Sequence, residues 1–239
     1  MTLEIELADD PPRACAAMLI GAAVGGGHVV LAGGGTPRAA YEELVQAVQA
    51  VGADLSETCF WVGDERCVPP DDERSNYKMI KESLLDPLAG PRSPTVRRIK
   101  GELGPEAAAA EYERELRAAG PGRFDLVLLG LGPDGHTASL FPGQESLSER
   151  SRLVVGVPEA GLEPFVPRVT LTLSALTSAR RVVFLVSGES KADAVAAAFG
   201  PGAVPDPHVP SSLLPPLAEE VTVLLDASAA RGLAVGERS

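Results

Sequence analysis

The chain has 239 residues, of which 45% are hydrophobic and 23% charged, a balance typical of a soluble globular protein with a sizeable core. A formal net charge of −12, with no basic patch in the sequence, argues against binding to nucleic acid or to an anionic membrane surface. Three cysteines without C-x-x-C spacing and three widely separated histidines argue against a disulfide framework and against a metal site.

The N-terminal stretch MTLEIELADD is acidic and holds no long apolar core, so the sequence predicts no signal peptide. The longest apolar runs are too short to span a bilayer. We therefore expect a cytoplasmic protein.

Short apolar runs recur along the chain and predict strands. Several are almost continuously apolar, as expected of strands that are covered on both faces. The predicted strands are 2–7, 28–33, 59–63, 124–130, 152–157, 168–173, 181–187 and 221–226.

Helical stretches alternate with these strands, at residues 12–24, 37–49, 75–85, 105–119 and 189–199. The alternation predicts an α/β fold with a doubly wound, mostly parallel sheet. The proline-rich segments 86–95 and 201–216 are predicted loops within one domain that covers residues 1–239, and the basic stretch 92–100 is predicted to be a solvated connection.

A glycine turn follows the strand at 28–33, where LAGGGTPRAA places Gly34 and Gly35 just before a predicted helix. Thr36 is the predicted N-cap and Pro37 the first helical residue. Glycines let the backbone approach an anion, and a helix N-terminus offers free N–H groups and a favourable dipole. A plain turn without a ligand is the alternative, since the pattern matches neither the dinucleotide fingerprint nor the P-loop.

Charged residues follow two further strands. Lys191 in VSGESKADAV lies near the first turn of a predicted helix, where the dipole disfavours a cation unless an anion is bound; a solvated surface lysine is the alternative. Asp64, Glu65 and Arg66 form a charged turn after the strand at 59–63. They could be a surface ion-pair cluster, or Arg66 could contact a phosphate or an oxyanion.

His136 stands in the tight loop GLGPDGHTASLFPG, directly after a predicted strand. A histidine suits a general base that activates water, and Asp134 could orient its ring. No G-x-S-x-G elbow is present, which favours direct attack by water over a covalent acyl-enzyme. A structural loop histidine is the alternative. Because ligands of α/β sheets bind beyond the carboxyl ends of the strands, we expect these loops to share one pocket.

Five blocks in order along the chain resemble the 6-phosphogluconolactonases, which share a superfamily with the glucosamine-6-phosphate deaminases. The blocks are 31–44, 61–85, 124–143, 169–176 and 182–195. The resemblance implies a three-layer α/β/α Rossmann-like fold and hydrolysis of 6-phospho-D-glucono-1,5-lactone to 6-phosphogluconate in the oxidative pentose phosphate pathway. It also implies that neither a metal nor an organic cofactor is needed.

The resemblance also implies roles for single residues. His136 is similar to the family's general base, with Asp134 beside it. Arg66 and Lys191 are similar to residues that contact the phosphate and the carboxyl end, without an indication of which contacts which. Three further parts of the sequence match the family, namely the phosphate turn Gly34, Gly35 and Thr36, an arginine at Arg168, and Asp64, which matches a proton-transferring carboxylate of the deaminases.

Two other functions stay open at this point. A deaminase carries a glutamate where this chain has Phe141, and without it assisted ring opening is less plausible. A sugar-phosphate sensor without turnover usually carries a DNA-binding domain, for which this acidic chain has no spare segment. We expect a monomer or weak homodimer whose partner is a small phosphosugar lactone.

Overall fold

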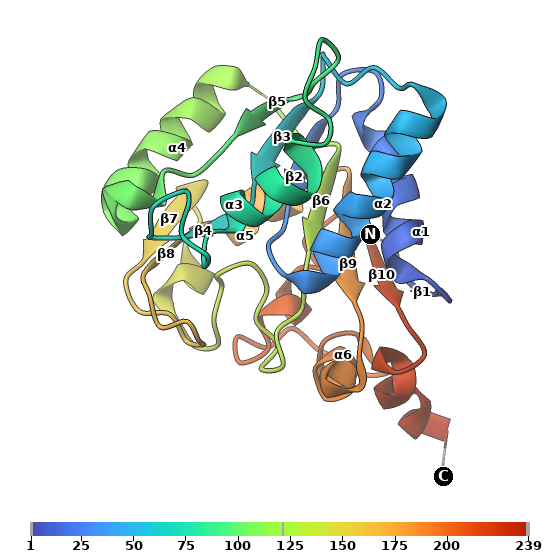
Figure 1. Cartoon of the computed structure of the whole chain (residues 1–239). Helices are drawn as coiled ribbons and strands as arrows, with labels where there is room; N and C mark the ends of the chain where they lie inside the picture. Colours follow the sequence, from blue (N-terminus) through green and yellow to red (C-terminus); the bar gives the residue numbers. More distant parts are fainter. Residues whose placement is uncertain (1, 121, 238–239) are drawn as a thin grey trace.

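The computed structural model describes residues 2–120 and 122–237 and contains a seven-stranded sheet in the order β1-β10-β9-β6-β2-β3-β5 (Figure 1). Every pairing in it is parallel, which confirms the predicted sheet type. The strands are β1 (Thr2–Leu7), β2 (His28–Leu31), β3 (Cys59–Val62), β5 (Thr95–Arg97), β6 (Leu126–Leu129), β9 (Arg181–Val186) and β10 (Glu220–Leu225).

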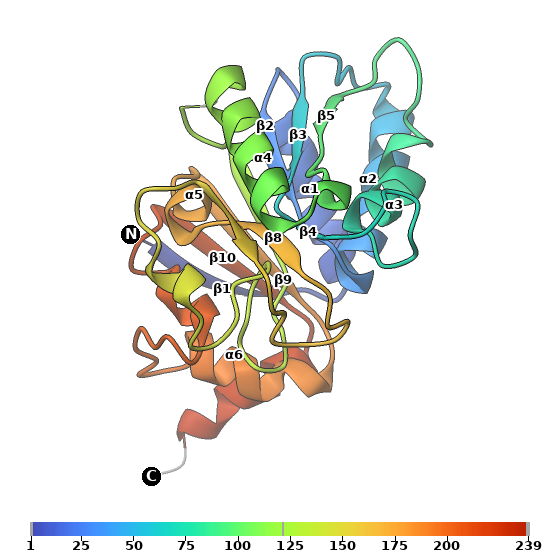
Figure 2. The ribbon, with the colours of Figure 1, turned by 90° about the vertical axis from the view of Figure 1, so that its left-hand side faces the viewer.

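Helices cover both faces of this sheet, as predicted. On one face, α1 (Pro11–Ala23) and α2 (Gly35–Val51) form a core with Leu126 and Leu128 of β6. On the other face, α4 (Pro105–Ala119), α5 (Leu173–Thr177) and α6 (Ala192–Phe199) share a core with Val127 and Leu129. Successive residues of a strand point to opposite faces, so a strand buried on both sides is apolar throughout. Figure 2 shows α6 beside the C-terminal segment, which it contacts.

A second, three-stranded antiparallel sheet was not predicted. It consists of β4 (Asp64–Arg66), β8 (Arg168–Leu171) and β7 (Val154–Val157), in that order. The prediction of a charged turn at 64–66 was therefore wrong, because these residues pair with β8. The prediction of a plain connection at 92–100 was wrong as well, because β5 lies within it and pairs with β3.

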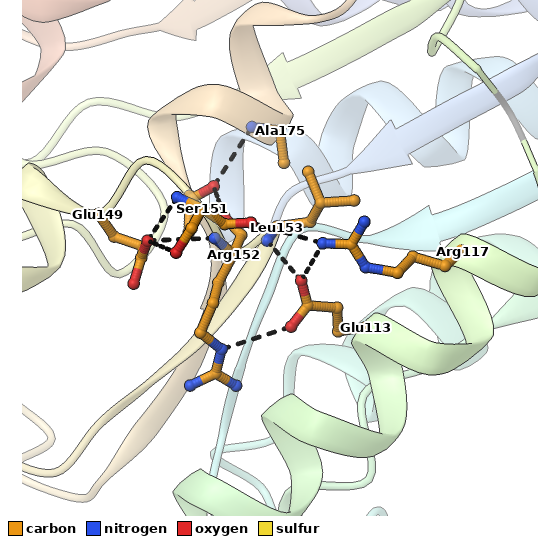
Figure 3. A network of polar contacts seen from close by, with 8 residues as sticks. Glu113, Arg117, Glu149, Ser151, Arg152, Leu153 and Ala175 are labelled. Atoms are coloured by element: carbon orange, nitrogen blue, oxygen red, sulfur yellow. Dashed lines mark hydrogen bonds and ion pairs between the residues drawn. The ribbon is translucent and has the colours of Figure 1, made fainter.

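A network of polar contacts fixes the small sheet against α4 (Figure 3). The Glu113 carboxylate of α4 accepts hydrogen bonds from the backbone N–H of Leu153 and from the Arg152 side chain. Glu149 accepts from the backbone N–H and the hydroxyl of Ser151, and these bonds lower the pKa of Glu149 to about 2. The chain is thus held in place just before it enters β7.

The N-termini of α2 and of the helix after β4 show how each helix is capped. Helix α2 begins at Gly35 with Gly34 as its N-cap, so the prediction that Thr36 is the cap was wrong. Gly34 adopts a φ of 109°, which turns the chain into the helix early and leaves Thr36 in the first turn. Ser75 caps α3 (Asn76–Ile80), its Oγ accepting from the N–H of Lys78 at 3.1 Å.

The other elements are short. A π-helical turn at Lys81–Leu85 continues α3, and 3₁₀ turns lie at Gly101–Leu103, Glu145–Ser148, Glu189–Lys191, Pro210–Leu213 and Ala229–Glu237. Within residues 2–120 and 122–237, no helix has the length and apolar character needed to cross a bilayer.

Candidate active site

The candidate site lies where four neighbouring strands, β9, β6, β2 and β3, end at the same edge of the sheet. After β2 the chain enters α2 on one face, whereas the next helix after β6 is α5 on the other face. Such a divergence opens a crevice at the carboxyl ends of the strands. A cavity of about 230 Å³ lies here, and it is lined by Gly33, Gly34, Asp64, Arg66, His136, Arg168 and Lys191, among others.

The glycine turn continues the cavity on one side. An adjoining cavity of about 280 Å³ shares Gly34 and Lys191 with the first and also reaches Gly35 and Thr36. The structure therefore places all the predicted site residues except Asp134 on the walls of two adjoining cavities. Asp134 contacts the site through His136.

Asp134 and His136 form a close pair. The Asp134 Oδ1 lies 2.5 Å from the Nδ1 of His136 and 3.2 Å from its backbone nitrogen. Burial acts to raise the pKa of Asp134, but the hydrogen bond and charge of His136 outweigh it, and this pKa is lowered. A carboxylate only accepts hydrogen bonds, so Nδ1 carries a proton, and in the neutral imidazole Nε2 has the lone pair. Nε2 has no partner in residues 2–120 and 122–237, so it is free to accept a proton from the cavity.

Two neighbours hold the His136 ring. A Cβ at Gly132 would lie 2.0 Å from its Nδ1 and 2.6 Å from the Asp134 Oδ1, so only glycine leaves room for the pair. Phe141, which is buried, stacks at a tilt with 4.9 Å between ring centroids. The loop therefore fixes the ring by packing as well as by hydrogen bonding.

The same loop is tied to the small sheet just after the histidine. Ala138 adopts a φ of 48°, in the left-handed region that side chains rarely occupy. The next residue, Ser139, is fully buried, and its hydroxyl donates to the Asp64 Oδ2 at 2.6 Å. Its backbone N–H donates to the Thr170 hydroxyl of β8 at 3.3 Å. These bonds hold the strained turn in place.

Among the described residues, Lys191 is the one cationic residue on the walls of both cavities. It is the N-cap of α6 and forms no ion pair within the described part of the chain. Burial lowers its pKa, while the charge of Asp134 acts in the opposite direction. The N–H groups of Gly35 and Thr36, in the first turn of α2, lack helical acceptors. An anion between these N–H groups and Lys191 would accept hydrogen bonds from the N–H groups and would pair with the charge of the lysine.

The two arginines differ in how they are held. Arg66 donates from Nη1 to the carbonyl of Arg74 at 2.5 Å, and its Nε is buried without a partner. Arg168 donates to the carbonyls of Val166 at 3.2 Å and Pro164 at 2.8 Å, so it braces the loop beside the cavity. Burial, together with the charge of Arg66, lowers the pKa of Arg168.

The surface ion-pair cluster considered for residues 64–66 is not present, because Asp64 and Glu65 are buried and neither forms an ion pair in the described residues. The Glu65 carboxylate instead accepts from the backbone N–H groups of Arg66, Asn76 and Tyr77 at 2.7–2.8 Å. It also accepts from the Ser75 hydroxyl at 3.0 Å. Glu65 thereby folds the loop back on itself.

This folding brings Asn76 to the cavity wall, a residue that the sequence reasoning missed. Its one signal in the sequence is that it is the only asparagine of the chain.

Comparisons with known proteins find relatives that match most of this chain. Residues 6–223 match the family described as glucosamine-6-phosphate isomerases/6-phosphogluconolactonase. A 6-phosphogluconolactonase of Mycobacterium tuberculosis is 42% identical over 193 residues, which are 76% of this chain and 77% of that protein. The human 6-phosphogluconolactonase is 39% identical over 210 residues, 86% of this chain and 80% of that protein.

Among solved structures, the 6-phosphogluconolactonase of Trypanosoma brucei superposes with a TM-score of 0.79 at 28% identity. The match covers 97% of this chain and 99% of that one. The chain therefore belongs to the glucosamine-6-phosphate isomerase/6-phosphogluconolactonase family.

Proposed function

We propose that the chain is a 6-phosphogluconolactonase, which hydrolyses 6-phospho-D-glucono-1,5-lactone to 6-phosphogluconate without a metal ion or organic cofactor. The observation that carries this proposal is that His136, paired with Asp134, lines a cavity together with Lys191, and that the adjoining cavity extends from Lys191 to the glycine turn. The proposed base and the proposed anion site thus lie on the walls of two adjoining cavities that share Lys191. The names of the relatives support the same substrate.

The substrate's phosphate is the ligand that best suits the glycine turn. The N–H groups of Gly35 and Thr36 donate to its oxygens, and Lys191 supplies a compensating charge. This anchoring fixes the distance from the phosphate to the lactone carbon, C1. Binding energy from a part of the substrate that does not react thereby positions the part that does.

His136 then acts on water. Its Nε2 takes a proton from the water molecule whose oxygen bonds to C1, and the carbonyl oxygen of the lactone becomes an oxyanion. Asp134 stabilises the resulting imidazolium. When the oxyanion collapses, the bond between C1 and the ring oxygen breaks, and that oxygen receives the proton from Nε2.

Arg66 is the group that stabilises the oxyanion in this proposal. Arg66 lines the cavity, and its Nη2 forms no hydrogen bond in residues 2–120 and 122–237, whereas Arg168 uses two nitrogens to brace the neighbouring loop. A fixed donor aimed at a developing charge lowers the barrier without any rearrangement at the moment of reaction.

The test is the decay of freshly made lactone, followed by NMR with and without enzyme, because the lactone also opens spontaneously. The unmodified protein should accelerate the decay, and His136→Ala should lower kcat/KM by about 10²-fold or more. His208→Ala is the matched control, because His208 is exposed and lies outside the cavity walls. Decay at the spontaneous rate would refute the proposed function, and full activity of His136→Ala would refute the assignment of the base.

A further inference from the structure

Asn76 has an amide whose orientation is fixed by its neighbours. Its Nδ2 donates to the backbone carbonyl of Asp64 at 2.8 Å and to the Asp64 Oδ1 at 3.2 Å. Both of these atoms are acceptors, so the amino group must face them and the carbonyl Oδ1 must face the other way. The residue is 2% exposed and lines the cavity.

The Asn76 Oδ1 lies beside the glycine turn. A Cβ at Gly33 would be only 2.0 Å from it, so the oxygen fills the space that a side chain there would take. In residues 2–120 and 122–237 it accepts no hydrogen bond, yet it is not among the atoms sealed from solvent. A nearly buried acceptor that opens only on a cavity is satisfied by a donor in that cavity.

The other polar groups of the cavity show what such a donor would be. Arg66, Arg168 and Lys191 only donate, which suits a phosphate and an oxyanion. Asp64 accepts, but each of its carboxylate oxygens already receives a bond, one from Asn76 and one from Ser139. The other accepting side chains on the walls are His136, which is the proposed base, and Glu163, which is exposed. The remaining donors of a sugar lactone are its ring hydroxyls, and these need an acceptor.

The residue type fits this task. Asn76 is the first residue of α3, and the cap of that helix is Ser75, so the asparagine is not needed for capping. The other side-chain caps at helix starts, Asp10 and Thr172, are not asparagines either. An asparagine is neutral and can donate to Asp64 while accepting from the cavity. An aspartate could not donate in this way, and a serine would be too short to do both.

We propose that Asn76 is a specificity-determining residue whose Oδ1 accepts a hydrogen bond from a ring hydroxyl of the lactone. Asp64, itself held by Ser139, is the positioning residue that fixes the amide. This inference rests on the proposed function, because it concerns how the same cavity recognises its substrate.

The test pairs a change in the enzyme with a change in the substrate. Four 6-phosphorylated 1,5-lactones are compared, the gluconolactone and its 2-deoxy, 3-deoxy and 4-deoxy analogues, with the unmodified protein and with Asn76→Ala. Removing the recognised hydroxyl should lower kcat/KM of the unmodified protein by about 3- to 10-fold. In Asn76→Ala the same analogue should show almost no additional loss relative to the parent lactone, because its partner is already gone.

The readout is a ratio of two kcat/KM values for one enzyme preparation, so a variant that folds only in part gives the same answer. We call the fold-loss of kcat/KM on removing a hydroxyl the deoxy penalty. Asn76→Ser serves as a second variant and should abolish the same deoxy penalty. Ser139→Ala should weaken the penalty without removing it, because the amide keeps both bonds to Asp64. Deoxy penalties that are equal in the unmodified protein and in Asn76→Ala would overturn the inference while leaving the proposed function intact. Absence of any lactone turnover by the unmodified protein would instead refute the proposed function.

Discussion

Replacing Gly33 by alanine is expected to destabilise the protein through a clash rather than through backbone strain. The φ of Gly33 lies outside the left-handed region, so an alanine can adopt the backbone conformation. Its Cβ, however, would lie 2.0 Å from Oδ1 and 2.3 Å from Cγ of Asn76. Asn76 is buried and must therefore move away from Asp64, giving up its two hydrogen bonds.

The magnitude follows from these bonds. Each contributes about 0.5–1.5 kcal/mol to the free energy of unfolding. Alanine also lowers the conformational entropy of the unfolded chain, which raises the free energy of unfolding by about 0.4–1 kcal/mol. The net loss is about 1–2 kcal/mol, which should lower Tm by roughly 2–8 °C in a protein of this size.

Gly35→Ala is the matched control for Gly33→Ala. No atom lies within 4 Å of a Cβ at Gly35, and its φ is also outside the left-handed region. Its stability should be unchanged or higher by up to about 1 kcal/mol. Urea unfolding and calorimetry of both variants measure the difference. Equal stability of the two would refute the packing of Asn76 against the glycine turn.

Three further predictions concern charge and geometry. Burial lowers the pKa of Lys191, so the affinity of the protein for 6-phosphogluconate should fall as the pH rises through that lowered pKa. Binding calorimetry between about pH 7 and 10 should show this fall. In Lys191→Arg the affinity should depend less on pH, because an arginine stays charged over this range. The pKa of Glu149 is lowered from 4.5 to about 2, so its contribution to stability is present above pH 4.5 and lost as the pH falls towards 2. The midpoint of urea unfolding should therefore vary less across this pH range in Glu149→Gln than in the unmodified protein. An equal variation in both proteins would contradict the hydrogen bonding described. Gly132→Ala should displace the His136 ring and lower kcat by about 10²-fold, whereas an unchanged kcat would show that the ring position is not critical.

The main sheet could be predicted because its central strands have a recognisable pattern in the sequence. Strands such as β6 are buried on both faces and are apolar at every position, and the loops that follow them contain glycine or charged residues. Since parallel neighbours end at one edge, the grouping of His136, Lys191 and the glycine turn could be inferred before any coordinates.

The small sheet and β5, the edge strand of the main sheet, could not be predicted in the same way. β4 and β5 have three residues each, too few to establish a periodicity, and β4 contains three charged residues in a row. β4 pairs with β8, which lies far along the chain, so its strand conformation depends on tertiary contacts. Asn76 was missed for a related reason, because it reaches the cavity only after Glu65 has folded the intervening loop.

The most direct test of the central claim is a crystal structure with 6-phosphogluconate bound. We expect the phosphate to lie on the N–H groups of Gly35 and Thr36 beside Lys191, and the C1 carboxylate to lie within hydrogen-bond reach of the His136 Nε2. A product whose C1 carboxylate lies away from His136, or whose phosphate lies outside the glycine turn, would contradict the central claim.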